Sequence, residues 1–263
     1  MKRYLINITG IILGIVLFSC NQSSKHETGN HRSDSLKIVS LTPSITKQLY
    51  LLDVQDFVVG HTSYCPAEDL KNSELVASAM EVNVEKIATL QPDVVFVSKL
   101  VKEKIIEKLR MLGIKVYYFE SPKSFDEICS QFLEIGKAVD KRERADSIVS
   151  VHRGKLDSLQ SAIPSGKTPK FFIEIGANPL YAATPESFMH DYIRFANGVN
   201  IAGDMKSGTI SRESVLTKNP DIIVIVTMGI VGKEEKEIWN EYPNLKAAKN
   251  NDIFVIDSDL ACS

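Results

Sequence analysis

Side chains with nucleophilic or basic character give little sign of a catalytic centre. Ser63 follows His61 by two residues in a polar loop, and the pair could act as nucleophile and base, but sequence neighbours seldom have the geometry that proton transfer needs. The chain has no Gly-x-Ser-x-Gly elbow, no Gly-x-Gly-x-x-Gly after its first predicted strand and no Gly-x-x-x-x-Gly-Lys-Ser/Thr loop. An enzyme of unknown reaction on an α/β scaffold is therefore the more distant alternative to a binding protein.

Side chains that could ligate a metal are also scattered. The five histidines include no closely spaced pair and the cysteines form no Cys-x-x-Cys motif, so we predict no metal or cofactor of the protein's own. Cys129 lies in an apolar helical register and is expected in the core. A bridge between Cys65 and Cys262 is an open alternative to free thiols.

The first half of the body alternates short apolar runs with helical patterns. Runs typical of buried strands are residues 37–41, 57–60, 94–97 and 115–119, and helices are predicted at residues 44–52, 84–90 and 102–112. Strands that alternate with helices indicate a parallel sheet covered on both faces, which places the chain in the α/β class.

The second half repeats this pattern after a long helical segment. Residues 124–163 have apolar side chains at helical spacing and predict one connecting helix, bent near Asp140. Pro220-Asp221 then takes the place that Pro92-Asp93 has in the first half, and the later strands and helix are expected at residues 170–175, 222–226, 253–256 and 187–196. We therefore predict two Rossmann-like lobes with parallel sheets, residues 37–123 and 164–263, joined by one long helix and separated by a ligand cleft. A continuous helix would permit only small closure of that cleft.

The N-terminal residues have the pattern of an export signal. Met1-Lys2-Arg3 precedes an apolar stretch that ends at Phe18 and is short for a membrane span, which predicts a signal peptide at residues 1–19. The segment that ends at Cys20 (LFSC) resembles the lipobox of bacterial lipoproteins, which implies that Cys20 is lipidated and that residues 20–36 form a flexible tether. The net charge of -2 shows no basic excess, so nucleic acid is not an expected partner.

Seven segments together resemble one family of carriers. They are 38–44 (IVSLTPS), Val59-Gly60 with Tyr64, 74–76 (ELV), 83–87 (NVEKI), 91–93 (QPD), 176–181 (GANPLY) and 210–216 (ISRESVL). With them the body resembles the class III, or helical-backbone, periplasmic binding proteins of ABC importers for cobalamin, haem and iron-siderophore complexes, and it is closest to the cobalamin-binding type. The resemblance implies a monomeric carrier without enzymatic activity, lipid-anchored to a bacterial membrane and facing the periplasm or the cell exterior. Its partners would be the permease and ATPase of the importer.

Within this family an acidic residue on each lobe docks onto arginines of the permease, and the matching positions are Glu74 and Glu213. Two carboxylates on a rigid body can fix its orientation through charge-assisted hydrogen bonds to guanidinium groups. Without the resemblance, both would be interpreted as ordinary solvated glutamates.

The resemblance also implies a set of cargo contacts. Tyr64 and Tyr181 match aromatic residues of the cobalamin-binding pattern, and flat rings suit a corrin or porphyrin face. The neighbouring positions expected to line the cleft are His61, Ser63 and Pro179, together with Ala79 and Ser207, which stand where cobalamin-binding relatives often have tryptophan. Cobalamin is the first expectation for the cargo, and haem or a ferric siderophore is the alternative.

Each alternative cargo would require particular side chains in the same loops. Haem would need an axial ligand, which His61, Tyr64, Tyr181 or His190 could supply. An anionic siderophore would favour arginines in the cleft, but Arg194 and Arg212 lie in helix-forming stretches and are expected to serve packing or helix ends. The chain stops at Ser263, where relatives continue into a final helix, so we also expect a truncated second lobe with exposed apolar surface.

Overall fold

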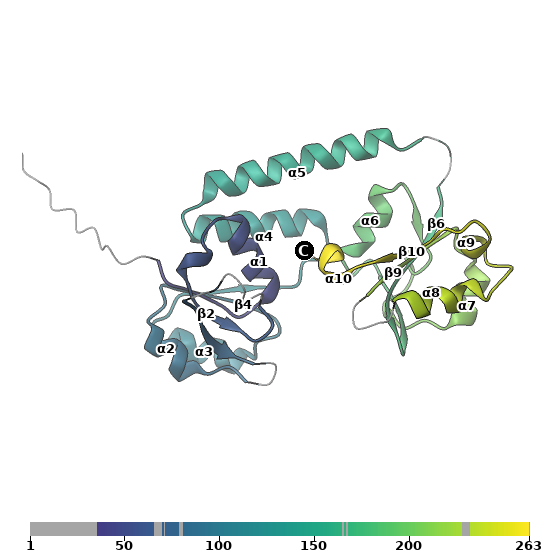
Figure 1. Ribbon diagram of the computed structural model, residues 1–263. Helices are drawn as coiled ribbons and strands as arrows, with labels where there is room; N and C mark the ends of the chain where they lie inside the picture. Colours follow the sequence, from purple (N-terminus) through teal and green to yellow (C-terminus); the bar gives the residue numbers. More distant parts are fainter. Residues whose placement is uncertain are drawn as a thin grey trace, which may run out of the picture. The chain divides into compact units, whose positions relative to one another are not determined.

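The computed structural model (Figure 1) describes residues 36–65, 70, 72–78, 81–164, 166, 168–227 and 232–262. The predicted signal peptide, Cys20, nearly all of the tether and Ala79 lie outside these residues. Among the helices that the structure describes, none combines the length and the apolar character needed to cross a bilayer.

Five short strands of the first half form one parallel sheet, as predicted. They are β1 (Ile38–Ser40), β2 (Val58–Thr62), β3 (Glu74–Ala77), β4 (Val94–Ser98) and β5 (Val116–Phe119), in the order β3-β2-β1-β4-β5. Every residue of the central strands β1 and β4 is buried, as expected for a sheet covered on both faces. β3 was not predicted, because it is short and begins with two exposed residues at the edge of the sheet.

Helices cover both faces of this sheet, because successive strand residues point to opposite sides. The elements of this part of the chain are α1 (Pro43–Leu51), the 3-10 helix η1 (Gln55–Phe57), α2 (Val84–Leu90) and α3 (Glu103–Met111). Ile38 and Phe96 belong to the apolar cluster that contains α1. Val39 and Val97 belong to the cluster on the other face, with residues of α2 and α3. The predicted helices 44–52, 84–90 and 102–112 are confirmed to within a residue at each end.

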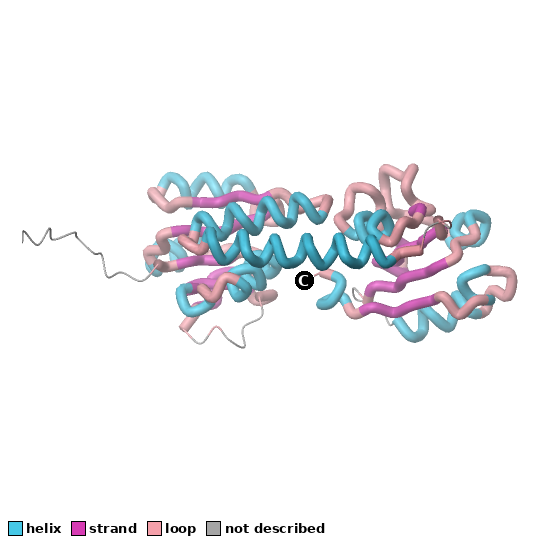
Figure 2. Tube along the Cα trace, turned by 90° about the horizontal axis from the view of Figure 1, so that it is seen from above, coloured by secondary structure: helices cyan, strands magenta, loops and turns pink. Residues whose placement is uncertain are grey.

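The connecting segment consists of two helices, so the prediction of one helix over residues 124–163 is wrong in its continuity. α4 (Phe125–Ala138) and α5 (Arg142–Ala162) lie side by side, as Figure 2 shows, and run antiparallel, because Asp126 at the start of α4 pairs with Arg153 of α5 at 2.7 Å. The chain reverses at Asp140, whose φ of 57° is left-handed, and the Lys141 N–H donates to the Gly136 carbonyl at 2.7 Å. This is the Schellman pattern of a helix end. The long helix that leads to the second lobe is thus α5 alone.

A glycine permits the close contact between these two helices. A Cβ atom placed on Gly136 of α4 would lie 2.5 Å from the Cβ of Ala145 in α5. Glycine at this position therefore lets the backbone of the second helix approach the first directly after the turn.

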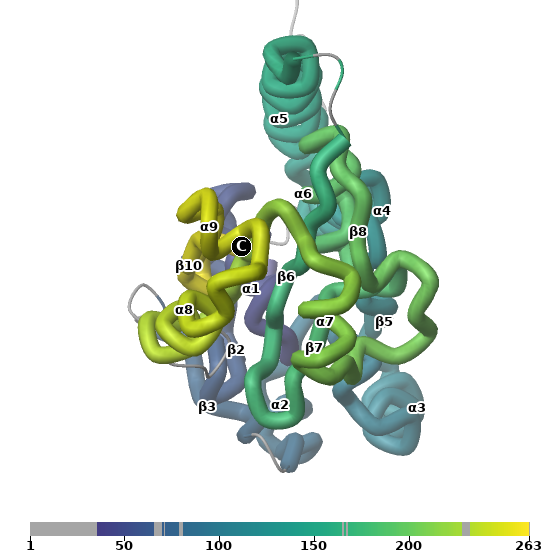
Figure 3. Tube along the Cα trace, turned by 90° about the vertical axis from the view of Figure 1, so that its right-hand side faces the viewer, coloured from purple at the N-terminus to yellow at the C-terminus, as the bar shows by residue number. Residues whose placement is uncertain are grey.

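The second sheet is mixed rather than wholly parallel. Its strands are β6 (Lys170–Ala177), β7 (Leu180–Ala182), β8 (Val199–Asn200), β9 (Ile222–Val226) and β10 (Ile253–Ile256). The order is β10-β9-β6-β7 with β8 also paired to β6, which can be followed in Figure 3, where β6 lies between β10 on one side and β7 and β8 on the other. β7 runs antiparallel to β6, so the prediction of a parallel sheet in the second lobe is wrong for this strand. The cause is a hairpin at Asn178-Pro179, too short for the crossover that parallel strands require.

Short helices surround the second sheet. They are α6 (Met189–Phe195), α7 (Arg212–Lys218), α8 (Gly232–Asn240), α9 (Lys246–Lys249) and α10 (Ser258–Ala261). The predicted helix 187–196 corresponds to α6, and the predicted strands 222–226 and 253–256 correspond to β9 and β10.

The predicted internal repeat is confirmed in atomic detail at Asp93 and Asp221. The Asp93 carboxylate accepts a hydrogen bond from the Lys37 N–H at 2.8 Å, and the Asp221 carboxylate accepts one from the Lys170 N–H at 2.9 Å. In both lobes the preceding helix ends at a residue in the left-handed region. The same aspartate hydrogen bond therefore fixes the start of an equivalent strand pair in each lobe, β1 with β4 and β6 with β9.

The lobes contact each other at the start of α4. The Phe125 N–H donates to the Asp191 carboxylate of α6 at 2.8 Å, and the Phe125 ring packs edge-on against Phe195 with 6.0 Å between centroids. Asp191 is buried and also pairs with Arg194 at 3.0 Å. Arg194 is exposed in the last turn of α6, so of the two predicted roles, packing or a helix end, it has the second. A carboxylate of the second lobe thus lies at the positive end of a first-lobe helix, where it is electrostatically favoured.

The described cysteines are all free, which excludes the alternative of a bridge between Cys65 and Cys262 in this structure. Cys65 and Cys129 are buried, the latter in the core as predicted. Burial raises the pKa of the Cys129 thiol, which keeps it neutral.

The core of the second lobe contains a carboxylate pair. Glu174 of β6 is fully buried and accepts a hydrogen bond of 2.7 Å from the Trp239 indole of α8. Glu235 is buried in the same helix and pairs with the guanidinium of Arg212, which lies 4.7 Å from the centroid of the Trp239 ring. Burial raises the pKa of Glu174 to about 8, and the Glu235 carboxylate adds to the rise. Glu174 is therefore protonated in the folded protein at neutral pH, while Arg212 balances the charge of Glu235.

This pKa shift predicts a stability that falls as the pH rises. Between about pH 5 and pH 8 the folded protein holds a proton that the unfolded Glu174 carboxyl, with its ordinary pKa of 4.5, has released. The unfolding free energy, measured by urea denaturation, should fall in this window by on the order of 1 kcal/mol per pH unit from this group. Glu174→Gln cannot titrate and should remove this contribution. The control Glu134→Gln, at an exposed position of α4, should keep the wild-type slope; equal slopes in all three proteins would contradict the assignment.

Candidate functional site

The predicted first-lobe contacts lie in the turn that follows β2. Ser63 and Tyr64 are exposed, and 65% of the Tyr64 surface is accessible. The next residue, Cys65, is buried, with its Sγ 3.0 Å from the Thr46 hydroxyl of α1 and 3.4 Å from that of Thr62. Because Cys65 anchors the turn to α1 and β2, the Tyr64 ring is left at the surface, where it can contact a ligand.

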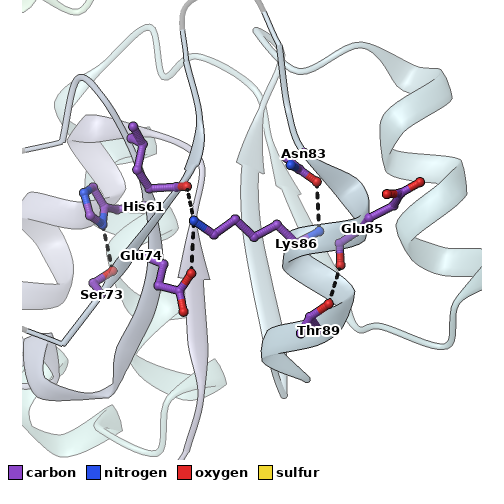
Figure 4. Close-up of polar contacts among 8 residues, drawn as sticks. His61, Ser73, Glu74, Asn83, Glu85, Lys86 and Thr89 are labelled. Atoms are coloured by element: carbon purple, nitrogen blue, oxygen red, sulfur yellow. Dashed lines mark hydrogen bonds and ion pairs between the residues drawn. The ribbon is translucent and has the colours of Figure 1, made fainter.

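His61 lies inside the lobe rather than beside the exposed tyrosine. Figure 4 shows its ring directed at Ser73, and its Nδ1 is 2.8 Å from the Ser73 hydroxyl. Burial lowers the pKa of His61, and the nearby Lys86 cation lowers it further, so the imidazole is neutral at neutral pH. The structure therefore gives His61 a hydrogen-bond partner other than Ser63, and the imagined pairing of these two as nucleophile and base does not form.

The predicted second-lobe contacts lie on the hairpin that joins β6 to β7. Pro179 is exposed at the turn, where the Asn178–Pro179 peptide bond is cis, and Tyr181 in the middle of β7 has 40% of its surface accessible. Tyr181 forms an isolated antiparallel bridge with Thr209. The structure thus brings Tyr181 beside the segment that contains Ser207, which is exposed as well. Ala79, the corresponding first-lobe position, lies outside the described residues.

Glu74, the predicted docking residue of the first lobe, is already part of an ion pair. It opens the edge strand β3, and its Oε2 lies 3.0 Å from the Lys86 ammonium. Figure 4 shows the Lys86 side chain extending from α2 toward β3. Its ammonium also donates to the Leu75 carbonyl of β3 at 3.0 Å. Sequence reasoning missed Lys86. Its only signal was the helix start at Asn83, whose side chain accepts from the Lys86 N–H at 2.8 Å and so places Lys86 in the first turn.

Glu213, the predicted docking residue of the second lobe, lies in the first turn of α7. The Ser211 side chain caps this helix by accepting a hydrogen bond from the Ser214 N–H at 3.2 Å. The backbone N–H of Glu213 and the Ser211 hydroxyl both lower the pKa of the Glu213 carboxyl, so it is ionised at neutral pH. The preceding residue, Arg212, holds the helix to the buried Glu235, which confirms the prediction that Arg212 serves packing.

The remaining candidate ligands of a metal are dispersed. His190 is half-buried, and its Nδ1 lies 3.2 Å from the Asn200 side chain. Within the part of the chain that the structure describes, no group of three or more His, Cys, Asp or Glu side chains could hold a metal ion. The arrangement offers exposed aromatic rings and exposed carboxylates, which suit binding and docking.

Comparisons with known proteins agree with this two-lobe architecture. The sequence profile of the periplasmic binding protein family matches residues 38–260. The chain is 30% identical over 240 residues to YvrC of Bacillus subtilis (strain 168), an uncharacterized ABC transporter substrate-binding lipoprotein, with 87% of this chain and 75% of YvrC covered. It is 26% identical over 193 residues to the vitamin B12-binding protein of Yersinia pestis (strain Pestoides F), with 72% of this chain and 69% of that protein covered.

A solved structure extends the likeness to the fold. A possible iron-binding (periplasmic solute-binding) protein from Staphylococcus epidermidis ATCC 12228 superposes with a TM-score of 0.74 at 27% sequence identity, and the match covers 86% of this chain and 91% of that one. The family profile spans both lobes and the helices between them. The predicted class III architecture is thus confirmed, and the chain belongs to the periplasmic binding protein family as a substrate-binding protein of an ABC transporter.

Proposed function

We propose that this protein captures cobalamin or a related corrinoid between its two lobes and delivers it to the permease and ATPase of an ABC importer. Haem or a ferric siderophore is the alternative cargo. The observation that carries the proposal is the exposure of Tyr64 and Tyr181, one on each lobe, in a chain of this family. The relatives named for vitamin B12 and for iron support both kinds of cargo.

The chemistry of the two tyrosines suits a large, flat metal complex. Each ring presents an apolar face and a polar edge, and the backbone that carries each ring is held by contacts of the protein itself. The backbone at Tyr64 is held by the buried Cys65 beside it, and the backbone at Tyr181 is held by pairing with β6 and Thr209. A backbone that is held in place before binding loses little conformational entropy when the cargo binds, and this favours affinity.

Titration with defined cargos tests the proposal. We expect the body without its lipid anchor to bind cyanocobalamin with sub-micromolar affinity, measured by calorimetry, with haemin and ferric siderophores as competitors. Tyr64→Ala and Tyr181→Ala should each weaken binding about tenfold, because stacking and burial of a ring contribute on the order of 1 kcal/mol or more. Phe254→Ala is the control, since the Phe254 ring is also exposed but lies near the amino end of β10, away from the carboxyl ends of the strands. Sub-micromolar binding to none of these cargos would reject the ligand class.

We further propose that Glu74 and Glu213 dock onto arginines of the permease. Docking by Glu74 involves exchange of its Lys86 partner for a guanidinium, whereas Glu213 is presented at a capped helix start. Docking therefore costs more free energy at Glu74 than at Glu213, because only Glu74 gives up an existing ion pair. Both carboxylates would fix orientation and speed encounter more than they add affinity.

Charge removal tests this docking. Glu74→Ala and Glu213→Ala should each weaken binding to the purified importer about tenfold, because a hydrogen bond to a charged group contributes about 1.5–3 kcal/mol. Cargo affinity should not change. Glu85→Ala is the matched control, because Glu85 is exposed in the same helix as Lys86 but points away from Glu74 in Figure 4. Unchanged importer binding in the double variant Glu74→Ala/Glu213→Ala would refute the docking role.

We also propose that the protein is exported and anchored to a bacterial membrane, facing the periplasm or the cell exterior, after cleavage before Cys20 and lipidation of its thiol. YvrC, the relative named as a lipoprotein, supports this address. In a bacterial host fed labelled palmitate, the wild-type chain should incorporate label and sediment with membranes, and Cys20→Ser should do neither. Equal labelling of the two proteins would overturn the anchor.

A further inference from the structure

The ring of Tyr181 packs against a glycine on its neighbouring segment. A Cβ atom placed on Gly208 would lie 2.2 Å from Cε1 and 2.6 Å from Cδ1 of the Tyr181 ring, far inside van der Waals contact. The ring edge therefore rests on the backbone of Gly208 itself. Real Cβ contacts do not occur at such distances, so any other residue at this position would displace the ring.

A second glycine borders Tyr181 from the other side. Gly176 of β6 pairs with Tyr181 across the hairpin, and a Cβ atom placed there would lie 3.2 Å from the Tyr181 Cβ. Glycine in a strand weakens the strand and often marks a close approach of another group, and an aromatic neighbour across the strands covers the gap that it leaves. Tyr181 is such a neighbour for both glycines.

Backbone pairing holds the Gly208 segment beside β7. The Ala182 N–H donates to the Gly208 carbonyl at 2.7 Å, and the Ile210 N–H donates to the Leu180 carbonyl at 3.1 Å. Thr209 pairs with Tyr181 between these two bonds. Gly208 is buried, whereas Tyr181 keeps 40% of its surface accessible, so one side of the ring is supported by protein and the rest faces outward.

From this geometry we infer that Gly208 is a positioning residue for cargo binding, because the absence of a side chain there sets the orientation in which Tyr181 presents its ring to a flat metal complex. The inference rests on the proposed function. Ser207, next to Gly208, is small and exposed. The aromatic surface beside the 207–209 segment therefore comes from Tyr181 of β7. Gly208 itself does not touch the cargo; it acts through the ring that it supports.

A double-mutant cycle separates positioning from a merely structural role. The proteins are wild type, Gly208→Ala, Tyr181→Ala and Gly208→Ala/Tyr181→Ala, titrated with cyanocobalamin and with haemin. Gly208→Ala should weaken binding of the probe by up to about tenfold, the loss expected when the Tyr181 ring itself is removed. This loss should shrink to less than twofold in the Tyr181→Ala background, because no ring is left to displace. Tyr181→Phe should bind like wild type, since the ring rather than the hydroxyl is positioned. Gly154→Ala is the control, because a Cβ there meets nothing within 4 Å.

The Cβ of Gly208→Ala would also lie 2.6 Å from the Ala182 carbonyl oxygen, so thermal unfolding is measured for every variant. If Gly208→Ala loses cooperative unfolding, Gly176→Ala takes its place in the cycle, with an expected loss of twofold to fivefold that again depends on Tyr181. A loss of equal size with and without Tyr181, or no loss at all, overturns the positioning role while the proposed function stands. Failure of the wild type to bind either probe rejects the proposed cargo, and with it this role of Gly208.

Discussion

Parallel pairing of strands that are buried on both faces is the constraint from which the rest of this molecule follows. β1 and β4 in the first lobe, and β6 and β9 in the second, run in the same direction, so helices must return the chain across the sheet after each strand. Carboxyl ends of such strands share one edge, where open α/β sheets bind their ligands. Tyr64 follows the carboxyl end of β2, and Tyr181 lies in the hairpin at the carboxyl end of β6.

Burial divides the glutamates of the second lobe into two kinds. Glu174 lies beside Trp239 with no accessible surface, and it is protonated at neutral pH because desolvation penalises its charged form. Glu213, at the capped and exposed start of α7, is ionised because a backbone N–H and the Ser211 hydroxyl stabilise its negative charge. Arg212 precedes Glu213 in α7. Its ion pair with Glu235 and its contact with the Trp239 ring hold α7 against the core that contains Glu174.

Carriers on one scaffold can differ in cargo because recognition depends on a few side chains at the mouth of the cleft. The named cargos of this chain's relatives, vitamin B12 and iron, differ accordingly. The proposed capture of a ready-made metal complex rests on the exposed rings of Tyr64 and Tyr181 and on the small residues Ser207 and Gly208 beside Tyr181. The contacts of Phe125 with Asp191 and Phe195 connect the start of α4 to α6 of the second lobe.

The sequence by itself determined the fold class, the two lobes, their repeat and the family, because these follow from apolar periodicity and from short local motifs such as Pro92-Asp93 and Pro220-Asp221. The sequence also placed an irregularity of the connecting segment near Asp140, but as a bend in one helix. Only the structure decided that the chain reverses there into two antiparallel helices. The tertiary structure alone decided that His61 is buried against Ser73, that Lys86 pairs with Glu74, and that Gly208 supports Tyr181. These contacts join residues that are distant in sequence or on separate strands, and periodicity carries no information about which distant side chains will meet.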